Sequence, residues 1–148
     1  MVHALEQIGR LLKADGILID IQPRRETALG EVHQAGRVIF AEPFPDQEDS
    51  WEDIRHAQAA FSEAIGRGLL ELEDHRDFDF VVYGDSTAEL QEALEAASAY
   101  STSVQDPDER LRWLAFAARV QEAAVSAGPG TQVAYREPVR MSRLRKPI

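Results

Sequence analysis

ALEQIGRLLKADGILIDIQP, residues 4–23, joins an amphipathic helix to an apolar strand through a single glycine. Apolar residues recur every three or four positions from Leu5 to Leu12, which places them along one side of a helix. Gly16 supplies the left-handed residue that commonly ends a helix. The run that follows, 17–21, is apolar except at Asp20, which is typical of a strand covered on both faces in a parallel sheet. The stretch therefore predicts an α/β fold with an interior strand.

The rest of the chain gives further helix and strand signals. Polar residues between Gly30 and Gly36 predict a loop, and a short strand follows at 37–41. Helices are predicted from Ser50 to Gly68, from the capping box at 86–89, and over 107–126. A closing strand over 131–145 contains Pro138, which indicates a bulge or a sheet edge at that point.

Residues 69–83 give the longest strand signal. Apolar residues occupy most even positions from Leu70 to Val82, and acidic residues occupy most odd positions from Glu71 to Asp79. This alternation predicts one buried face and one wet face. The interruption at 74–77 lacks the Asn-Gly or Asp-Gly chemistry of a tight hairpin, so we expect one long strand rather than two.

Two segments resemble a known family. Residues 4–23 resemble the helix, the leucine-lysine-proline-glycine-glycine turn and the fifth strand of class I S-adenosylmethionine-dependent methyltransferases. The chain keeps Leu12, Lys13 and Gly16 of that turn but lacks its proline and one glycine. VAYREPVRMSRLRKPI, residues 133–148, resembles the seventh strand with which those enzymes end. The resemblance spans nearly the whole chain, as the C-terminal half of that fold.

This resemblance implies a particular sheet. It is a small mixed sheet of three or four strands with helices on both faces, in a single domain over 1–148. Residues 17–22 run parallel to 69–83, and the antiparallel strand 132–145 lies between them. We therefore expect an α/β fold with α+β character that resembles a truncated methyltransferase.

The family's cofactor is held by the half of the fold that this resemblance does not include. That half carries a glycine-rich loop after its first strand and an acid that ends its second strand. The Gly-x-Gly runs at 66–68 and 128–130 both follow helices here. We expect no cofactor, no binding of S-adenosylmethionine by the chain alone, and no catalytic residues, since no nucleophile-elbow, zinc-protease or phosphate-loop motif is present.

Composition excludes several function classes. The 148 residues include no cysteine, so there is no disulfide and no thiolate metal site. No apolar run reaches the ~18 residues of a membrane span, and no secretory leader is recognisable, so we expect a cytoplasmic protein without a membrane. The net charge of −10 argues against general nucleic-acid binding, which rests on a positive surface.

Charge is unevenly distributed along the chain. Residues 42–109 carry 19 acids and 3 arginines, whereas residues 136–148 carry five basic residues and one acid. These two segments can attract each other across a homo-oligomer. We prefer the simpler interpretation, in which the acids lie on solvated helix faces and the arginines line an outer strand.

Three residues are candidate ligand-binding or interface residues. Asp20 is a carboxylate within an apolar run, where burial is expected to shift its pKa. Arg24 and Arg25 follow that strand, in a segment that often forms the substrate side of the cleft in the resembling family, and can meet an anion. Structural or solubilising roles are the favoured interpretation for all three. A metal site at Glu73, His75 and Asp77 is disfavoured because these residues would lie on a wet strand face.

Assembly is the main functional expectation. Without a fourth strand beside it, the strand 17–21 presents an unpaired edge with no lysine or proline to discourage pairing. The helix over 107–126 is also apolar over a broad arc, which indicates an interface. We expect a homodimer in which residues 3–22 contribute to the contact.

Three functions are compatible with these observations. The first, which we favour, is a methyltransferase-like interaction or dimerisation module that is not catalytic by itself. The second is the C-terminal part of a methyltransferase whose cofactor-binding half lies upstream or on a separate polypeptide. The third is a small-ligand binding protein whose pocket is lined by Arg24, Arg25 and aromatic residues.

Overall fold

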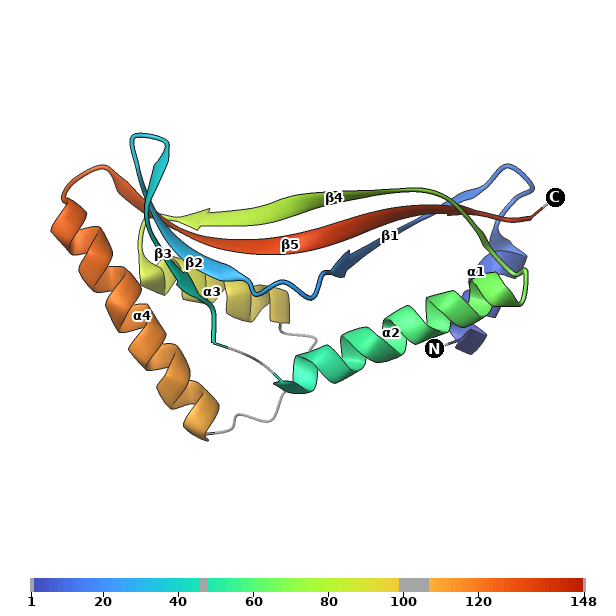
Figure 1. Ribbon diagram of the computed structural model, residues 1–148, viewed down its shortest axis with the longest axis horizontal. Helices are drawn as coiled ribbons and strands as arrows, with labels where there is room; N and C mark the ends of the chain where they lie inside the picture. The colour runs from blue at the N-terminus through green and yellow to red at the C-terminus, as the bar shows by residue number, and fades with distance from the viewer. Residues whose placement is uncertain (1, 46–47, 99–106, 148) are drawn as a thin grey trace. The chain divides into compact units, whose positions relative to one another are not determined.

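The computed structural model describes residues 2–45, 48–98 and 107–147 (Figure 1). Helices and strands both contribute strongly, which confirms the α+β class, but the sheet has five strands rather than three or four. The helix expected to begin after Ser50 begins two residues before it. In chain order the elements are α1 (Val2–Leu11), β1 (Ile17–Pro23), β2 (Leu29–Gln34), β3 (Arg37–Pro43), α2 (Glu48–Gly66), β4 (Glu71–Gly84), α3 (Thr87–Ser98), α4 (Pro107–Ala127) and β5 (Thr131–Arg145).

Strand β5 is the centre of the sheet. One of its edges pairs antiparallel with β2 and then with β1, and its other edge pairs with β4. β4 runs opposite to β5 (Figure 1), so β1 and β4 are parallel to each other with β5 between them, as predicted. Among the described residues every neighbouring pair of strands is antiparallel, so the expectation of a mixed sheet is wrong.

Strand β2 lies where a polar loop was expected between Gly30 and Gly36. It forms a hairpin with β3 through Ala35 and Gly36, whose φ angles are 50° and 73°. Two consecutive positive φ angles are the geometry of the tight turn whose twist matches that of a hairpin. The loop prediction is wrong because β2 carries few apolar residues, so its alternation is weak.

Pro138 lies at a change of partner along β5. Arg136 is the last residue paired with β2, and Val139 is the first paired with β1. Pro138, which has no backbone N–H donor, therefore lies where this edge of β5 pairs with neither β2 nor β1. The Pro138 carbonyl still accepts a hydrogen bond from the Arg24 backbone N–H at 2.8 Å.

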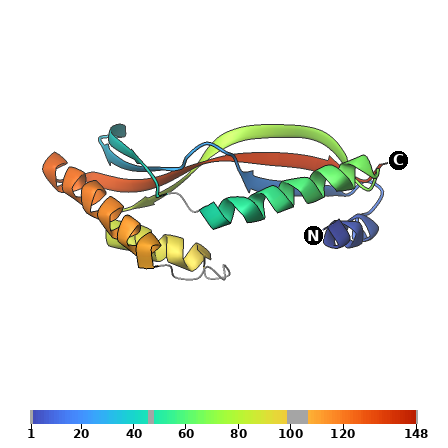
Figure 2. The ribbon, with the colours of Figure 1, turned by 60° about the horizontal axis from the view of Figure 1, so that its bottom comes forward.

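The chain divides into two compact units, and β4 and β5 contribute to both. Unit 1 comprises Met1–Arg25, Gln47–Phe78 and Pro138–Ile148, and unit 2 comprises Glu26–Asp46 and Asp79–Glu137. In unit 1, α1 and α2 lie on the same side of the sheet (Figure 2). Their contact with the strands buries a cluster formed by Leu5, Ala60, Ala64, Leu70 and Leu144.

Unit 2 has its own core, in which α3 and α4 pack on the sheet. Its buried residues are Val32, Leu90, Phe116, Val120 and Val133. Gly30 lies directly beneath Phe116, because a Cβ atom at this glycine would lie only 2.2 Å from the Phe116 Cζ atom. The start of β2 and the middle of α4 can approach so closely only with glycine at this position.

Two further expectations about the sheet are wrong. Within each unit the helices pack against one face of the strands, not against both. Leu70, which directly precedes β4, is buried, but Leu72, Phe78 and Phe80 on the apolar face of β4 are exposed. β4 is nevertheless one long strand, as expected, although no helix core covers its middle residues.

Candidate functional site

Three exposed apolar residues of unit 1 lie on β1. Ile17, Ile19 and Ile21, which we call the isoleucine face, are 46–57% exposed. Successive strand residues point to opposite sides, and Leu18 packs against the helix-covered core, so the isoleucine face lies on the uncovered side. β1 is therefore covered by helices on one face only. The expectation of an interior strand covered on both faces is wrong.

The outer edge of β1 is unpaired within the part of the chain that the structure describes. β1 is the end strand of the order β1-β5-β2-β3, and β3 pairs with β2 rather than covering β1. An end strand presents backbone N–H and C=O groups that can pair with another polypeptide. The expected free edge is therefore present, next to the isoleucine face.

A ladder of ion pairs crosses from β5 to β4 beside this surface. Arg145 Nη2 lies 3.1 Å from Glu71 Oε2, and Arg143 Nε lies 2.9 Å from Glu73 Oε2. Arg143 and Arg145 are the cross-strand neighbours of Ile19 and Ile17. Acids of β4 and arginines of β5 thus pair within one chain, and these arginines lie on the central strand rather than on the outer strand that we expected.

Asp20 is half-buried in the middle of β1, opposite Ser142 of β5. Burial raises the pKa of its carboxyl group, and a hydrogen bond from the Gln22 side chain partly opposes this rise. The expected shift of the pKa by burial is therefore present. The carboxylate is also the only formal charge within β1.

Arg24 and Arg25 have different surroundings. Arg24 Nη1 lies 3.4 Å from Asp77 Oδ2, whereas Arg25 is exposed. Asp77 also accepts two hydrogen bonds from Arg140, at 2.7 and 2.9 Å, and this hydrogen bonding lowers the pKa of its carboxyl group. Arg24 therefore takes part in a charge cluster within the chain, and Arg25 extends from the end of β1 into solvent.

A second charged cluster lies in unit 2, on the sheet face opposite α3 and α4, and only Glu31 and His33 at its centre are buried. Glu31 is 2% exposed, and its Oε2 atom lies 2.7 Å from His33 Nε2. Its Oε1 atom lies 3.0 Å from Arg136 Nε, as an ion pair whose N–H is not aimed at the oxygen. Arg136 Nη1 continues the cluster to Asp79 at 3.2 Å, and the His33 ring meets Tyr83 edge-on.

Sequence reasoning missed this cluster because Glu31 and His33 fall in the segment expected to be a loop. The available signal was the Ala35-Gly36 pair between two short runs with apolar residues, which is compatible with a hairpin. The charged groups of the cluster bind one another, as buried charges generally must. We call this cluster of Glu31, His33, Arg136 and Asp79 the clamp, because its central ion pair joins β2 to β5.

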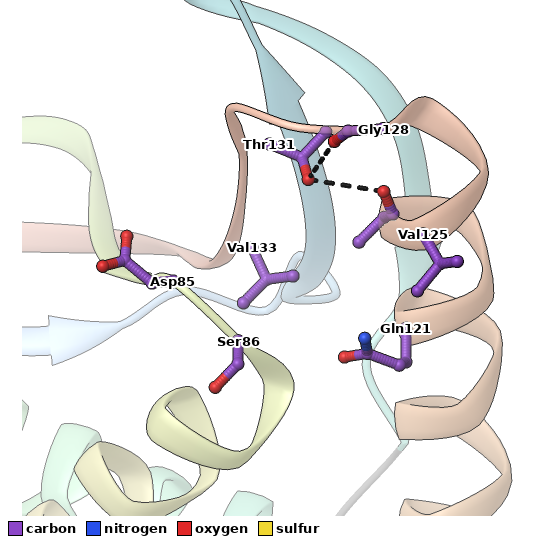
Figure 3. Close-up of a pocket in the computed structure, with 8 residues that line it drawn as sticks. Asp85, Ser86, Gln121, Val125, Gly128, Thr131 and Val133 are labelled. Atoms are coloured by element: carbon purple, nitrogen blue, oxygen red, sulfur yellow. Dashed lines mark hydrogen bonds between the residues drawn. The ribbon is translucent and has the colours of Figure 1, made fainter.

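A pocket of about 220 Å³ lies in unit 2 where α3 begins and α4 ends (Figure 3). The Thr131 hydroxyl donates to the carbonyl oxygens of Ala124 and Gly128 at 3.3 and 3.1 Å. Gln121 accepts a hydrogen bond from Thr87 at 2.9 Å. The pocket is lined by Asp85, Ser86, Gln121, Ala124, Val125, Gly128, Thr131 and Val133, and so by neither Arg24 nor Arg25.

The carboxylates of the disfavoured metal site are bound by arginines. Glu73 pairs with Arg143 and Asp77 with Arg140, so both groups near His75 already have cationic partners. Within the described ranges, no cluster of three or more histidine, aspartate and glutamate residues is placed to hold a metal ion.

Helix α4 has two apolar sides, as its sequence indicates. Phe116 and Val120 are buried in the core of unit 2, whereas Leu111, Leu114 and Val125 are 51–69% exposed.

None of the helices, over the residues that the structure describes, has the length and apolar character needed to cross a membrane.

Comparisons with protein-family models, with curated proteins and with solved structures find no match to the chain.

Proposed function

We propose that the chain is a methyltransferase-like association module that is not catalytic by itself and that binds a second copy through β1. The observation that carries this proposal is the unpaired outer edge of β1 beside the isoleucine face. Strand addition satisfies the backbone groups of such an edge, and an isologous pair uses the same surface on both subunits. We also propose the cytoplasm as its compartment.

Burial of the isoleucine face favours association. Each of its three side chains is about half exposed, so complete burial would stabilise a complex by about 1 kcal/mol per residue. The ion pairs of Arg143 and Arg145 form a polar border beside this apolar surface. An apolar centre with a polar rim is the common composition of a protein interface.

Sedimentation velocity tests the proposal. At micromolar concentration the chain should sediment at twice its 16.5 kDa monomer mass. Ile19→Lys should weaken the dimer at least about tenfold, because it places a charge in the contact. Ile39→Lys is the matched control, since Ile39 is 48% exposed on another end strand, β3. A monomer at all concentrations, or equal effects of both substitutions, would refute this assembly.

A second candidate function is supported by the order of the strands. The resembling methyltransferases have this arrangement of two parallel strands with the closing antiparallel strand between them, and β1, β4 and β5 have it too. In this alternative the β1 edge pairs with a cofactor-binding half encoded upstream or separately. The chain alone would still not bind S-adenosylmethionine.

Coexpression followed by calorimetry separates the two candidate functions. The chain alone should give no heat with S-adenosylmethionine under either proposal. Coexpression with the polypeptide encoded directly upstream should leave the homodimer intact if the first proposal is right. Replacement of the homodimer by a complex with micromolar affinity for S-adenosylmethionine would instead establish the second.

A further inference from the structure

We infer that two copies of the chain pair their β1 strands antiparallel about a twofold axis that passes through Ile19. This inference rests on the proposed homodimer and specifies its register. The axis places Ile19 opposite its own copy, Ile17 opposite Ile21, and Leu18 opposite Asp20. The isoleucine faces of both chains then form one continuous apolar surface.

Side-chain alternation restricts the possible registers. Residues directly opposite each other in an antiparallel pair point to the same side of the sheet. A register that places odd residues opposite even residues would put the isoleucine faces of the two copies on opposite sides of the joined sheet, and no twofold axis relates the copies in such a register. An axis through a residue keeps them on one side, where cross-strand pairs of β-branched side chains stabilise the contact.

Asp20 selects among the remaining registers. An axis through Asp20 would place two half-buried carboxylates directly opposite each other, and like charges at this position are destabilising. An axis through Leu18 would place Ile21 opposite Asp15 and leave fewer isoleucines in contact. The axis through Ile19 avoids both costs, because each Asp20 then faces a leucine.

Charges beyond the ends of β1 are compatible with this register but do not select it, because an axis through Asp20 would place Asp15 and Arg25 directly opposite each other. Asp15 is exposed in the turn before β1, and extending the register would place it opposite Pro23 of the second copy. Arg25 is two residues beyond that proline and is also exposed. Diagonal neighbours in a regular strand pair lie about 7–8 Å apart, and Asp15 and Arg25 lie in the turn before β1 and the bend after it, where a long arginine side chain can span such a distance. The twofold axis therefore creates two equivalent Asp15–Arg25 pairs, which gives Arg25 a role at the interface.

Disulfide trapping tests the register, and the absence of native cysteine makes the result unambiguous. Under mild oxidation Ile19→Cys should form a disulfide-linked dimer, because residues on the axis lie within bridging distance. Ile17→Cys and Ile21→Cys should crosslink efficiently with each other and poorly with themselves. Asp20→Cys should not crosslink with itself.

A charge exchange supplies the second test. Asp15→Arg and Arg25→Asp should each raise the dimer dissociation constant about three- to tenfold, since each removes two exposed ion pairs and creates like-charge contacts. The double variant should restore the original dissociation constant, because both pairs are re-formed with reversed charge. Additive weakening in the double variant would overturn the inferred pairs.

The possible failures are distinguishable. A chain that sediments as a monomer overturns both the proposed function and this register. A dimer that crosslinks through Asp20→Cys alone overturns the register but leaves the proposed function standing. A dimer that crosslinks through Val125→Cys, on the exposed side of α4, and not through Ile19→Cys overturns both by placing the contact elsewhere.

Discussion

Gly30 is the position where a single methyl group should disturb the protein most directly. A Cβ atom there would lie 2.2 Å from the buried ring of Phe116, so Gly30→Ala should lower the free energy of unfolding by about 1–3 kcal/mol through overpacking. Urea denaturation measures the loss. Gly66→Ala is the control, because open space surrounds Gly66 at the end of α2 and alanine favours helix by up to about 1 kcal/mol. Equal stabilities of the two variants would contradict the close approach of β2 and α4.

Glu31 makes a different contribution, through charge rather than volume. Glu31→Gln should lower the free energy of unfolding by about 1–3 kcal/mol, because it leaves buried partners in the clamp without their carboxylate. Glu71→Gln, also opposite an arginine of β5, should cost about 1 kcal/mol or less because that pair is exposed. Chemical denaturation of both variants measures the difference, and a clamp without structural importance would give similar small values.

Glu137 should make stability depend on pH. Burial raises the pKa of its carboxyl group in the folded chain, so folding favours the protonated form, and this contribution to stability is lost as pH rises. Glu137→Gln should therefore be more stable than the native chain at pH 7. The advantage should disappear below about pH 4, where the carboxyl is protonated in both folded and unfolded states. Urea midpoints at several pH values provide the measurement.

Asp77 gives a comparison of opposite sign. Hydrogen bonding from Arg140 lowers the pKa of its carboxyl group, so the ionised form stabilises the fold at neutral pH. Asp77→Asn should be less stable than the native chain at pH 7, and the difference should shrink as pH falls below about 4. If the stability of the Asp77 and Glu137 variants relative to the native chain changes in the same direction with pH, the structure gives one of the two carboxyl environments incorrectly.

At the level of elements, long and strongly periodic segments could be predicted from the sequence. The spacing of apolar residues identified α1 and α4, and parity identified β4 as one long strand. β2 could not be predicted because its alternation is weak and its stability comes from pairing with β3 and β5. The acids of β4 are exposed, as predicted, but their ion pairs could not be predicted because the arginines that bind them lie far along the chain, on β5.

Some features of the candidate site could be predicted from the sequence and others could not. The free edge of β1 and the burial of Asp20 could be predicted, because both depend on the composition of one strand. The clamp could not be predicted, since it requires the register between Glu31 of β2 and Arg136 of β5. Local patterns show which residues can face a core, but they do not show which distant charges will meet.

For the whole molecule, β5 should be the most protected strand in amide hydrogen exchange. It pairs along both edges, with β4 on one side and with β2 and β1 on the other, whereas β1 and β3 are end strands. Amides paired within the sheet should therefore exchange more slowly in β5 than in either end strand. Mass spectrometry of peptides from the three strands measures this order. Faster exchange in β5 than in β3 would contradict the sheet order.

The unpaired edge of β1 also affects how the purified chain will behave on acidification. A net charge of −10 keeps molecules apart near pH 7, and Asp20 is the one gatekeeper charge within an otherwise apolar end strand. The isoelectric point is about 4.8, and burial raises the pKa of the Asp20 carboxyl group above its ordinary value. Acidification therefore removes colloidal repulsion and protonates Asp20 at a higher pH than an unburied aspartate, so fibrillar precipitates should nucleate at β1 first.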